Sequence, residues 1–148
     1  MDRFFRGFIA GIIGGVPSII FNNLTKYFHF SSVRFSDFFA VFIYGFKTSS
    51  LQYVLFSIFG QFIFFGILGS IFAFMLLGIS SQGYIIKGWL FGATIWFLTY
   101  AVVTLFKLPN FKETLLSTSV SNFIGASIWG IVMALSLAYL DKKVGQKP

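Results

Sequence analysis

Residues 48–86 read TSSLQYVLFSIFGQFIFFGILGSIFAFMLLGISSQGYII and contain no charged side chain. A helix needs about 20 mostly apolar residues to cross the hydrocarbon core of a bilayer, so this stretch is long enough. A helical hairpin would need about 40 residues plus a turn, which favours one long helix. The polar clusters at 48–50 and 80–83 mark its ends. We predict a transmembrane helix over residues 51–79.

Further uncharged runs extend this reading to the whole chain. Residues 7–25, 88–106 and 114–140 are each long enough to span, whereas residues 38–46 are too few. The predicted fold is all-α integral membrane, a bundle of about four transmembrane helices plus a short interfacial or re-entrant helix. It forms a single transmembrane domain over residues 1–148. The predicted spans are residues 5–25, 51–79, 84–106 and 113–140, and the short helix covers residues 37–46.

The ends of two predicted helices carry capping signals. Ser36 or Asp37 is the expected N-cap of the short helix. Asn110, with Glu113 three residues later, resembles a capping pair that opens the last helix. The basic N-terminus resembles a signal peptide, but no small-x-small cleavage site follows the first apolar run. We therefore expect an uncleaved first helix.

The composition excludes several classes of protein. Hydrophobic residues make up 57% of the chain and charged residues 10%, well below the roughly 25% charged residues of soluble domains. The absence of cysteine excludes disulfides and thiol chemistry. The eleven Lys and Arg residues are scattered beside apolar runs, so we expect contacts with membrane lipids and no nucleic-acid partner. No cofactor is expected. The residues predicted to contact lipid head groups are Arg3, Arg6, Arg34, Lys142 and Lys143.

The distribution of basic residues gives an orientation. If both termini lie on one side, that side carries six Lys and Arg residues and the other carries five. The positive-inside rule then places the termini in the cytoplasm, although a dual topology stays open. The first group is Arg3, Arg6, Lys87, Lys142, Lys143 and Lys147, and the second is Lys26, Arg34, Lys47, Lys107 and Lys112.

Small residues recur at four-residue intervals on the predicted spans. Helices associate in membranes through close approach at such residues and through a few polar contacts. We expect mainly packing within the monomer, with a homo-oligomer or a membrane-protein partner as the alternative. The predicted helix-packing residues are Gly7, Gly11, Gly15, Gly88, Gly92, Asn122, Ala126, Gly130 and Ala134.

A few uncharged polar residues lie deep in the predicted spans. They form a candidate polar path, although hydrogen bonding between helices explains the same residues. Ion-coupled transporters place ionisable residues within spans, whereas the acidic residues of this chain lie at predicted helix ends or in loops. Only uncoupled transport is compatible with this distribution. The candidate path residues are Gln61, Thr94, Thr99 and Asn122.

Catalysis has a single candidate cluster, His29, Arg34 and Asp37, in the first connecting segment. Such a set could bind a lipid phosphate or act as an acid–base pair. A lone histidine does not make a metal site, and interfacial Arg and Asp residues usually cap helices and reach toward water. We predict no catalytic residues, no metal and no enzymatic activity.

Residues 88–92 (Gly-Trp-Leu-Phe-Gly) and 95–98 (Ile-Trp-Phe-Leu) are followed by Pro109 and a final helix rich in Gly and Ala. This second half of the chain resembles the YqhR-like small membrane proteins of spore-forming Firmicutes. That family has no established activity to carry over. The resemblance implies a multi-pass protein of the bacterial cytoplasmic membrane.

These observations predict a structural or accessory role through contacts between helices and with lipids. The alternative is a subunit of an oligomeric channel, or of an uncoupled transporter for a small solute. The first reading is based on the small-residue stripes. The second is based on the candidate polar path.

Overall fold

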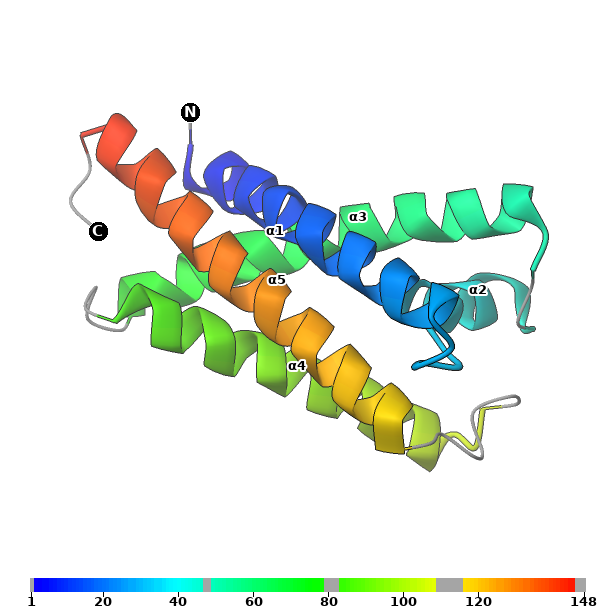
Figure 1. The fold of residues 1–148 in the computed structure, drawn as a ribbon. Coiled ribbons are helices and arrows are strands. Elements are labelled where there is room, and N and C mark those ends of the chain that lie inside the picture. Colours follow the sequence, from blue (N-terminus) through cyan, green and yellow to red (C-terminus); the bar gives the residue numbers. More distant parts are fainter. Residues whose placement is uncertain (1, 47–48, 79–82, 109–115, 146–148) are drawn as a thin grey trace.

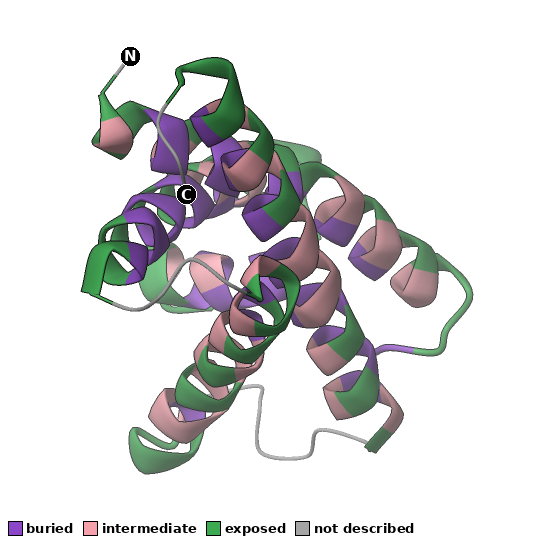
Figure 2. Cartoon of the chain, turned by 90° about the vertical axis from the view of Figure 1, so that its left-hand side faces the viewer, coloured by how far each residue is buried: buried purple, intermediate pink, exposed green. Residues whose placement is uncertain are grey.

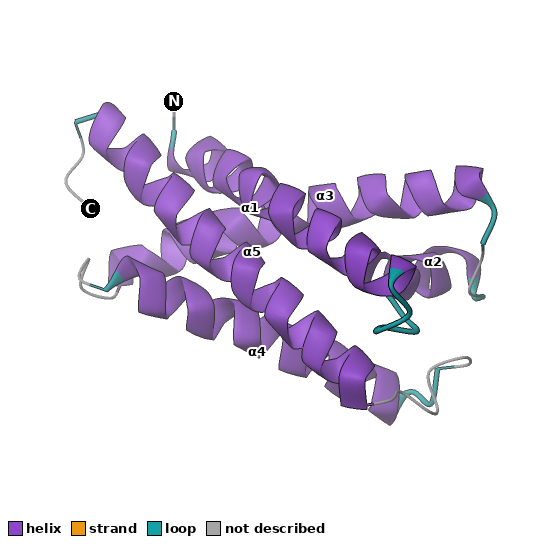
Figure 3. Cartoon of the chain, viewed as in Figure 1, coloured by secondary structure: helices purple, strands orange, loops and turns teal. Residues whose placement is uncertain are grey.

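The computed structural model describes residues 2–46, 49–78, 83–108 and 116–145, and within them it contains five α-helices (Figure 1). Four of these described helices are long and apolar enough to cross a membrane, which confirms the predicted fold class. The described residues between the helices form loops and turns (Figure 3). The helices are α1 (Arg3–Tyr27), α2 (Phe35–Tyr44), α3 (Leu51–Gly78), α4 (Tyr84–Leu105) and α5 (Leu116–Lys143).

Helix α2 begins two residues before the predicted start, and neither Ser36 nor Asp37 is its N-cap. Arg34 is the N-cap, and Asp37, three residues later, accepts a hydrogen bond from the Arg34 backbone N–H at 2.8 Å. The acidic residue therefore serves the helix start from inside the first turn. Gly45 ends the helix in the left-handed conformation (φ 77°). The capping pair expected at Asn110 and Glu113 lies outside the described residues.

The long helices pack in the order α3, α1, α5, α4. Helices α1 and α5 cross at the centre, α3 packs on α1, and α4 packs on α5 (Figure 1). Buried faces turn toward one another along these contacts (Figure 2). The start of α1 and the end of α5 lie at the same end of the bundle (Figure 1).

Glycines let the central helices approach one another closely. A Cβ on Gly11 would overlap the backbone of Phe65 on α3, and a Cβ on Gly130 of α5 would overlap the carbonyl oxygen of Gly88 on α4. The hydrophobic effect gives helices in a bilayer little reason to associate, because lipid tails are also apolar. Close packing at small residues drives the association instead.

Trp129 of α5 occupies the middle of the apolar core. Its ring stacks on Phe65 of α3 at a centroid distance of 4.9 Å and lies 6.0 Å from Phe91 of α4. Its indole N–H donates to the carbonyl oxygen of Gly11 on α1 at 3.0 Å. One side chain therefore connects the long helices at the point where they converge.

Helix α2 is too short to span, because its ten residues extend only about 15 Å. It packs on the N-terminal half of α3, with Phe39 5.3 Å from Phe64 between ring centroids. Its other face enters a second apolar cluster, in which Phe38 lies 5.8 Å from Tyr100 of α4. The helix thus packs against α3 on one side and α4 on the other.

Candidate functional site

The start of α2 holds a buried carboxylate surrounded by cations. Asp37 is 2% exposed, and its Oδ2 accepts from the Lys26 ammonium at 3.0 Å. Its Oδ1 accepts from Nη2 of Arg34 at 3.1 Å. Charged hydrogen bonds of this kind are roughly twice as strong as neutral ones. These bonds join the end of α1 to the start of α2. We call Lys26, Arg34 and Asp37 together the anchor of α2.

Asp37 is held as an anion. Burial by itself raises the pKa of this carboxyl group, but the hydrogen bond from the Arg34 backbone and the charges of Arg34 and Lys26 outweigh it. The net effect places the pKa of Asp37 below its ordinary value. The three side chains together therefore carry a net charge of +1 at neutral pH.

Arg34 connects this anchor to α1 through a second contact. Its Nη1 donates to Oδ1 of Asn23 at 3.1 Å, and its Nε lies 3.4 Å from Oδ1 of Asp37. A guanidinium carries five N–H donors, so Arg34 keeps two beyond those used in these bonds and the Nη2 bond to Asp37. Its side chain is 14% exposed.

A groove lies beside this anchor along the C-terminal half of α1. Its volume is about 630 Å³, and it combines aliphatic side chains with the polar groups of the anchor. The two chemistries come from one helix and the loop that follows it. The lining residues are Ile19, Ile20, Asn23, Leu24, Lys26, Tyr27 and Arg34.

The loop before α2 is fixed to α5 by polar contacts. The Ser32 backbone N–H donates to Oγ1 of Thr118 at 3.0 Å, and Nδ2 of Asn122 donates to the carbonyl oxygen of Val33 at 3.3 Å. Asn122 also donates to the Tyr100 hydroxyl on α4 at 3.0 Å. These bonds hold the rim of the groove in place.

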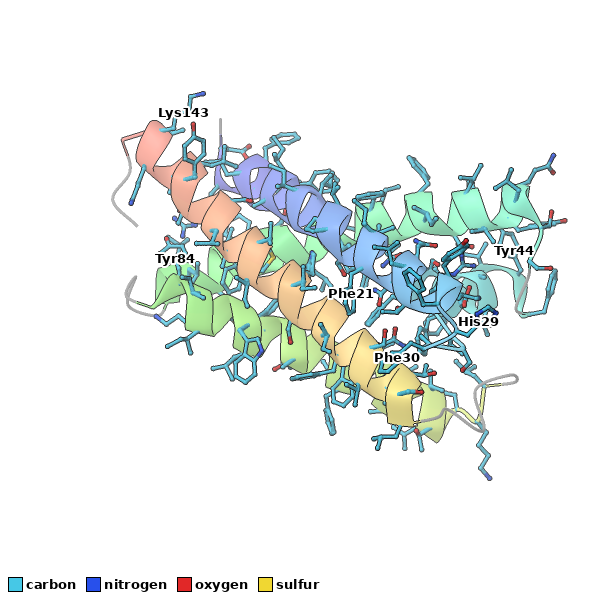
Figure 4. The ribbon with its side chains drawn as sticks, in the orientation of Figure 1. Phe21, His29, Phe30, Tyr44, Tyr84 and Lys143 are labelled. Carbon is cyan, nitrogen blue, oxygen red and sulfur yellow. The ribbon has the colours of Figure 1, made fainter. Side chains whose placement is uncertain are left out.

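The opposite end of the bundle has an ion pair of its own. Nε of Arg6 on α1 lies 2.9 Å from Oδ1 of Asp141 on α5, and both side chains are 1% exposed. The Tyr84 hydroxyl of α4 donates to Oδ2 of Asp141 at 3.4 Å. Figure 4 shows Tyr84 and Lys143 at this end, away from His29. The pair ties the first and last helices together.

Comparisons with known proteins give no relative for this chain. No protein-family model, no curated protein and no solved structure matches it.

The predicted helix-packing residues lie on two contacts between helices. Gly7 and Gly11 meet α3, and a Cβ on Gly15 would come within 2.8 Å of the Phe65 ring. On the other contact Gly88 meets Gly130 and Ala134, and Gly92 meets Ala126. Asn122 differs from the rest of its stripe, because it makes hydrogen bonds with Tyr100 and Val33.

The candidate path residues are not joined to one another by hydrogen bonds in the described part of the chain. Thr94 and Thr99 donate to the carbonyl oxygens of Leu90 and Ile95 within their own helix. Thr94 is exposed on the outside of α4. Gln61 is 1% exposed on α3, and its Nε2 has no hydrogen-bond partner among the described residues.

Among the predicted lipid contacts, Arg6 is a correction. Its side chain is buried against Asp141, so it does not reach the head groups. Arg3 donates from Nε to the carbonyl oxygen of Ala73 at 2.7 Å. Lys142 and Lys143 are exposed at the end of α5. Arg34 remains partly exposed in the groove.

The candidate catalytic cluster is divided in the structure. His29 is exposed in the loop after α1, with a positive φ of 59°, whereas Asp37 is buried and bonded to Arg34 and Lys26. Sequence reasoning missed Asp141 as the partner of Arg6. The signal that could have found it is an Arg early in the first span and an Asp late in the last, with both termini on one side.

Proposed function

We propose that this chain is an accessory protein of the bacterial cytoplasmic membrane that acts through contacts of its helices with lipids and with other membrane proteins. The observation that carries this proposal is the use of its acidic groups. In the described residues Asp2 caps α1, Asp37 anchors α2, and Asp141 pairs with Arg6. Each of these three carboxylates helps to hold the fold together.

Large apolar side chains are exposed on the long helices. Phe56 and Phe59 of α3 are 54% and 58% exposed, and Phe97 of α4 is 63% exposed. Aromatic and aliphatic side chains of this kind suit acyl chains and the flanks of other helices. The proposal also places both termini in the cytoplasm. The common position of the described ends supports one side for both, and the six-to-five count of basic residues favours the cytoplasm.

A solute-release assay tests this proposal. The purified protein is reconstituted into liposomes loaded with small neutral and charged solutes, and release is compared with protein-free liposomes. An accessory protein gives the same release rate in both. Faster release that depends on protein would overturn the proposal.

One observation favours the channel or uncoupled transporter as a second candidate. Asn22 of α1, Ser36 of α2 and Gln61 of α3 each have a buried side-chain atom without a hydrogen-bond partner among the described residues, and so does Oδ1 of Asn122. Buried polar groups normally find a protein or water partner. Under this candidate the release would slow when Gln61 is replaced by Leu, and would not slow when exposed Thr94 is replaced by Val.

A further inference from the structure

The groove beside α1 changes in character along its length. Ile20 and Leu24, one turn apart, are 55% and 50% exposed and give it an apolar wall. Asn23, Lys26 and Arg34 give it a polar rim at the end of the helix. An apolar wall that leads to cations at the end of a span is the arrangement that a membrane lipid meets.

The net charge of the rim determines whether the groove favours an anionic or a cationic ligand. Lys26 and Arg34 each contribute a positive charge and Asp37 a negative one, which leaves a net charge of +1. Asp37 is almost fully buried, whereas 31% of the Lys26 side chain and 14% of the Arg34 side chain are exposed. A molecule in the groove therefore meets cations rather than the carboxylate.

We propose that this groove binds one anionic phospholipid, with the phosphate at Lys26 and Arg34 and an acyl chain along Ile20 and Leu24. The inference rests on the proposed function and names the lipid class that the site takes. The two remaining N–H donors of Arg34 can reach phosphate oxygens, which guanidinium groups bind in bidentate geometry.

Head-group charge separates the lipid classes. A phosphatidylglycerol head group carries one negative charge and neutralises the rim. A phosphatidylcholine head group adds a quaternary ammonium, and the carboxylate that could balance it is buried and bonded to Lys26 and Arg34. Free phosphate makes no use of the apolar wall. The groove therefore favours an anionic lipid over both alternatives.

Native mass spectrometry of the full-length protein tests the site. The protein is equilibrated with equal amounts of chain-matched phosphatidylglycerol and phosphatidylcholine in detergent, and retained lipids are counted. Wild type should retain one phosphatidylglycerol under conditions that remove phosphatidylcholine. Lys26→Gln should weaken phosphatidylglycerol retention about fivefold, and Lys26→Arg should restore it.

Lys107→Gln is the matched control, because it removes the same charge from an exposed position after α4 that does not line the groove. It should leave retention unchanged. Equal retention of both lipids by wild type would overturn the proposal, as would equal losses in Lys26→Gln and Lys107→Gln. Release of the lipid by excess soluble glycerol phosphate would also overturn it, since the site would then recognise phosphate alone.

The two proposals fail independently. Loss of lipid selectivity leaves the solute-release result of the accessory role unchanged. Protein-dependent solute release would overturn the accessory role while leaving lipid selectivity at Lys26 intact.

Discussion

Arg6 and Asp141 lie near opposite ends of the sequence, yet their Nε and Oδ1 atoms are 2.9 Å apart and both side chains are buried. Moving two charges out of water is costly, and their attraction offsets this cost only while both are present. The pair therefore acts as a lock between the first and last helices.

Replacing Asp141 by Asn should leave the guanidinium of Arg6 buried without its counter-charge. We expect a loss of about 3–5 kcal/mol in the free energy of unfolding. Thermal unfolding in mild detergent, followed by circular dichroism, measures the change. Lys142→Gln, at the neighbouring exposed position, should shift stability by less than about 0.5 kcal/mol. Equal melting of the two variants would show that the pair does not lock the helices.

Removing both charges should restore much of that loss. In Arg6→Met with Asp141→Leu no charge is left unpaired, and apolar side chains fill the space. We expect the double variant to unfold at a higher temperature than Asp141→Asn in the same thermal assay. A double variant that is less stable than Asp141→Asn would contradict this explanation.

The α4–α5 contact predicts a sharp difference between two leucine substitutions. Gly130→Leu would drive a side chain into the backbone of Gly88, whereas Phe74→Leu alters a side chain that is 51% exposed on α3. We expect the first variant to lose the folded state and the second to keep it. Yield and monodispersity by size-exclusion chromatography measure both. Equal tolerance at the two positions would remove this contact from the account.

Acid should release the anchor of α2. The pKa of Asp37 is lowered in the folded chain relative to 3.8, so its ion pairs stabilise fully above that pH and lose strength as the pH falls through the folded value. The unfolding free energy of wild type should therefore fall more steeply below about pH 4 than that of Asp37→Asn. Denaturant titrations at a series of pH values measure both slopes, and parallel curves would refute the prediction.

Trp129 should stabilise the fold through its indole N–H as well as through the packing of its ring. Trp129→Phe keeps a ring on Phe65 but loses the indole N–H bond to the carbonyl of Gly11. We expect a loss of about 1 kcal/mol. Trp89→Phe is the control, because its indole bonds to Ser127 at an exposed position. Unfolding followed by circular dichroism should give a lower free energy of unfolding for Trp129→Phe than for Trp89→Phe.

The transmembrane spans could be predicted because their length and the four-residue spacing of small residues can be read directly from the sequence. Gly88, Gly92 and Gly130 follow that spacing and meet in the structure. The pairing of Arg6 with Asp141 was not predictable in this way, because it depends on which helices become neighbours. The two-residue shift of α2 has a local origin instead. Asp37 accepts a hydrogen bond from the backbone N–H of Arg34, so Arg34 becomes the N-cap rather than Ser36 or Asp37.

The candidate site was likewise predictable only in part. The sequence marks Arg34 as a candidate for lipid contact, but Lys26 and Asn23 join it only because the loop after α1 folds back. Periodicity along one helix carries no information about such a turn.

The most direct test of the accessory role is native mass spectrometry of the protein in nanodiscs formed straight from its own membrane. The accessory role predicts complexes that carry phospholipid or a second membrane protein, with solute release equal to that of protein-free liposomes after purification. A bare homo-oligomer that releases solute would contradict the accessory role and establish the channel in its place.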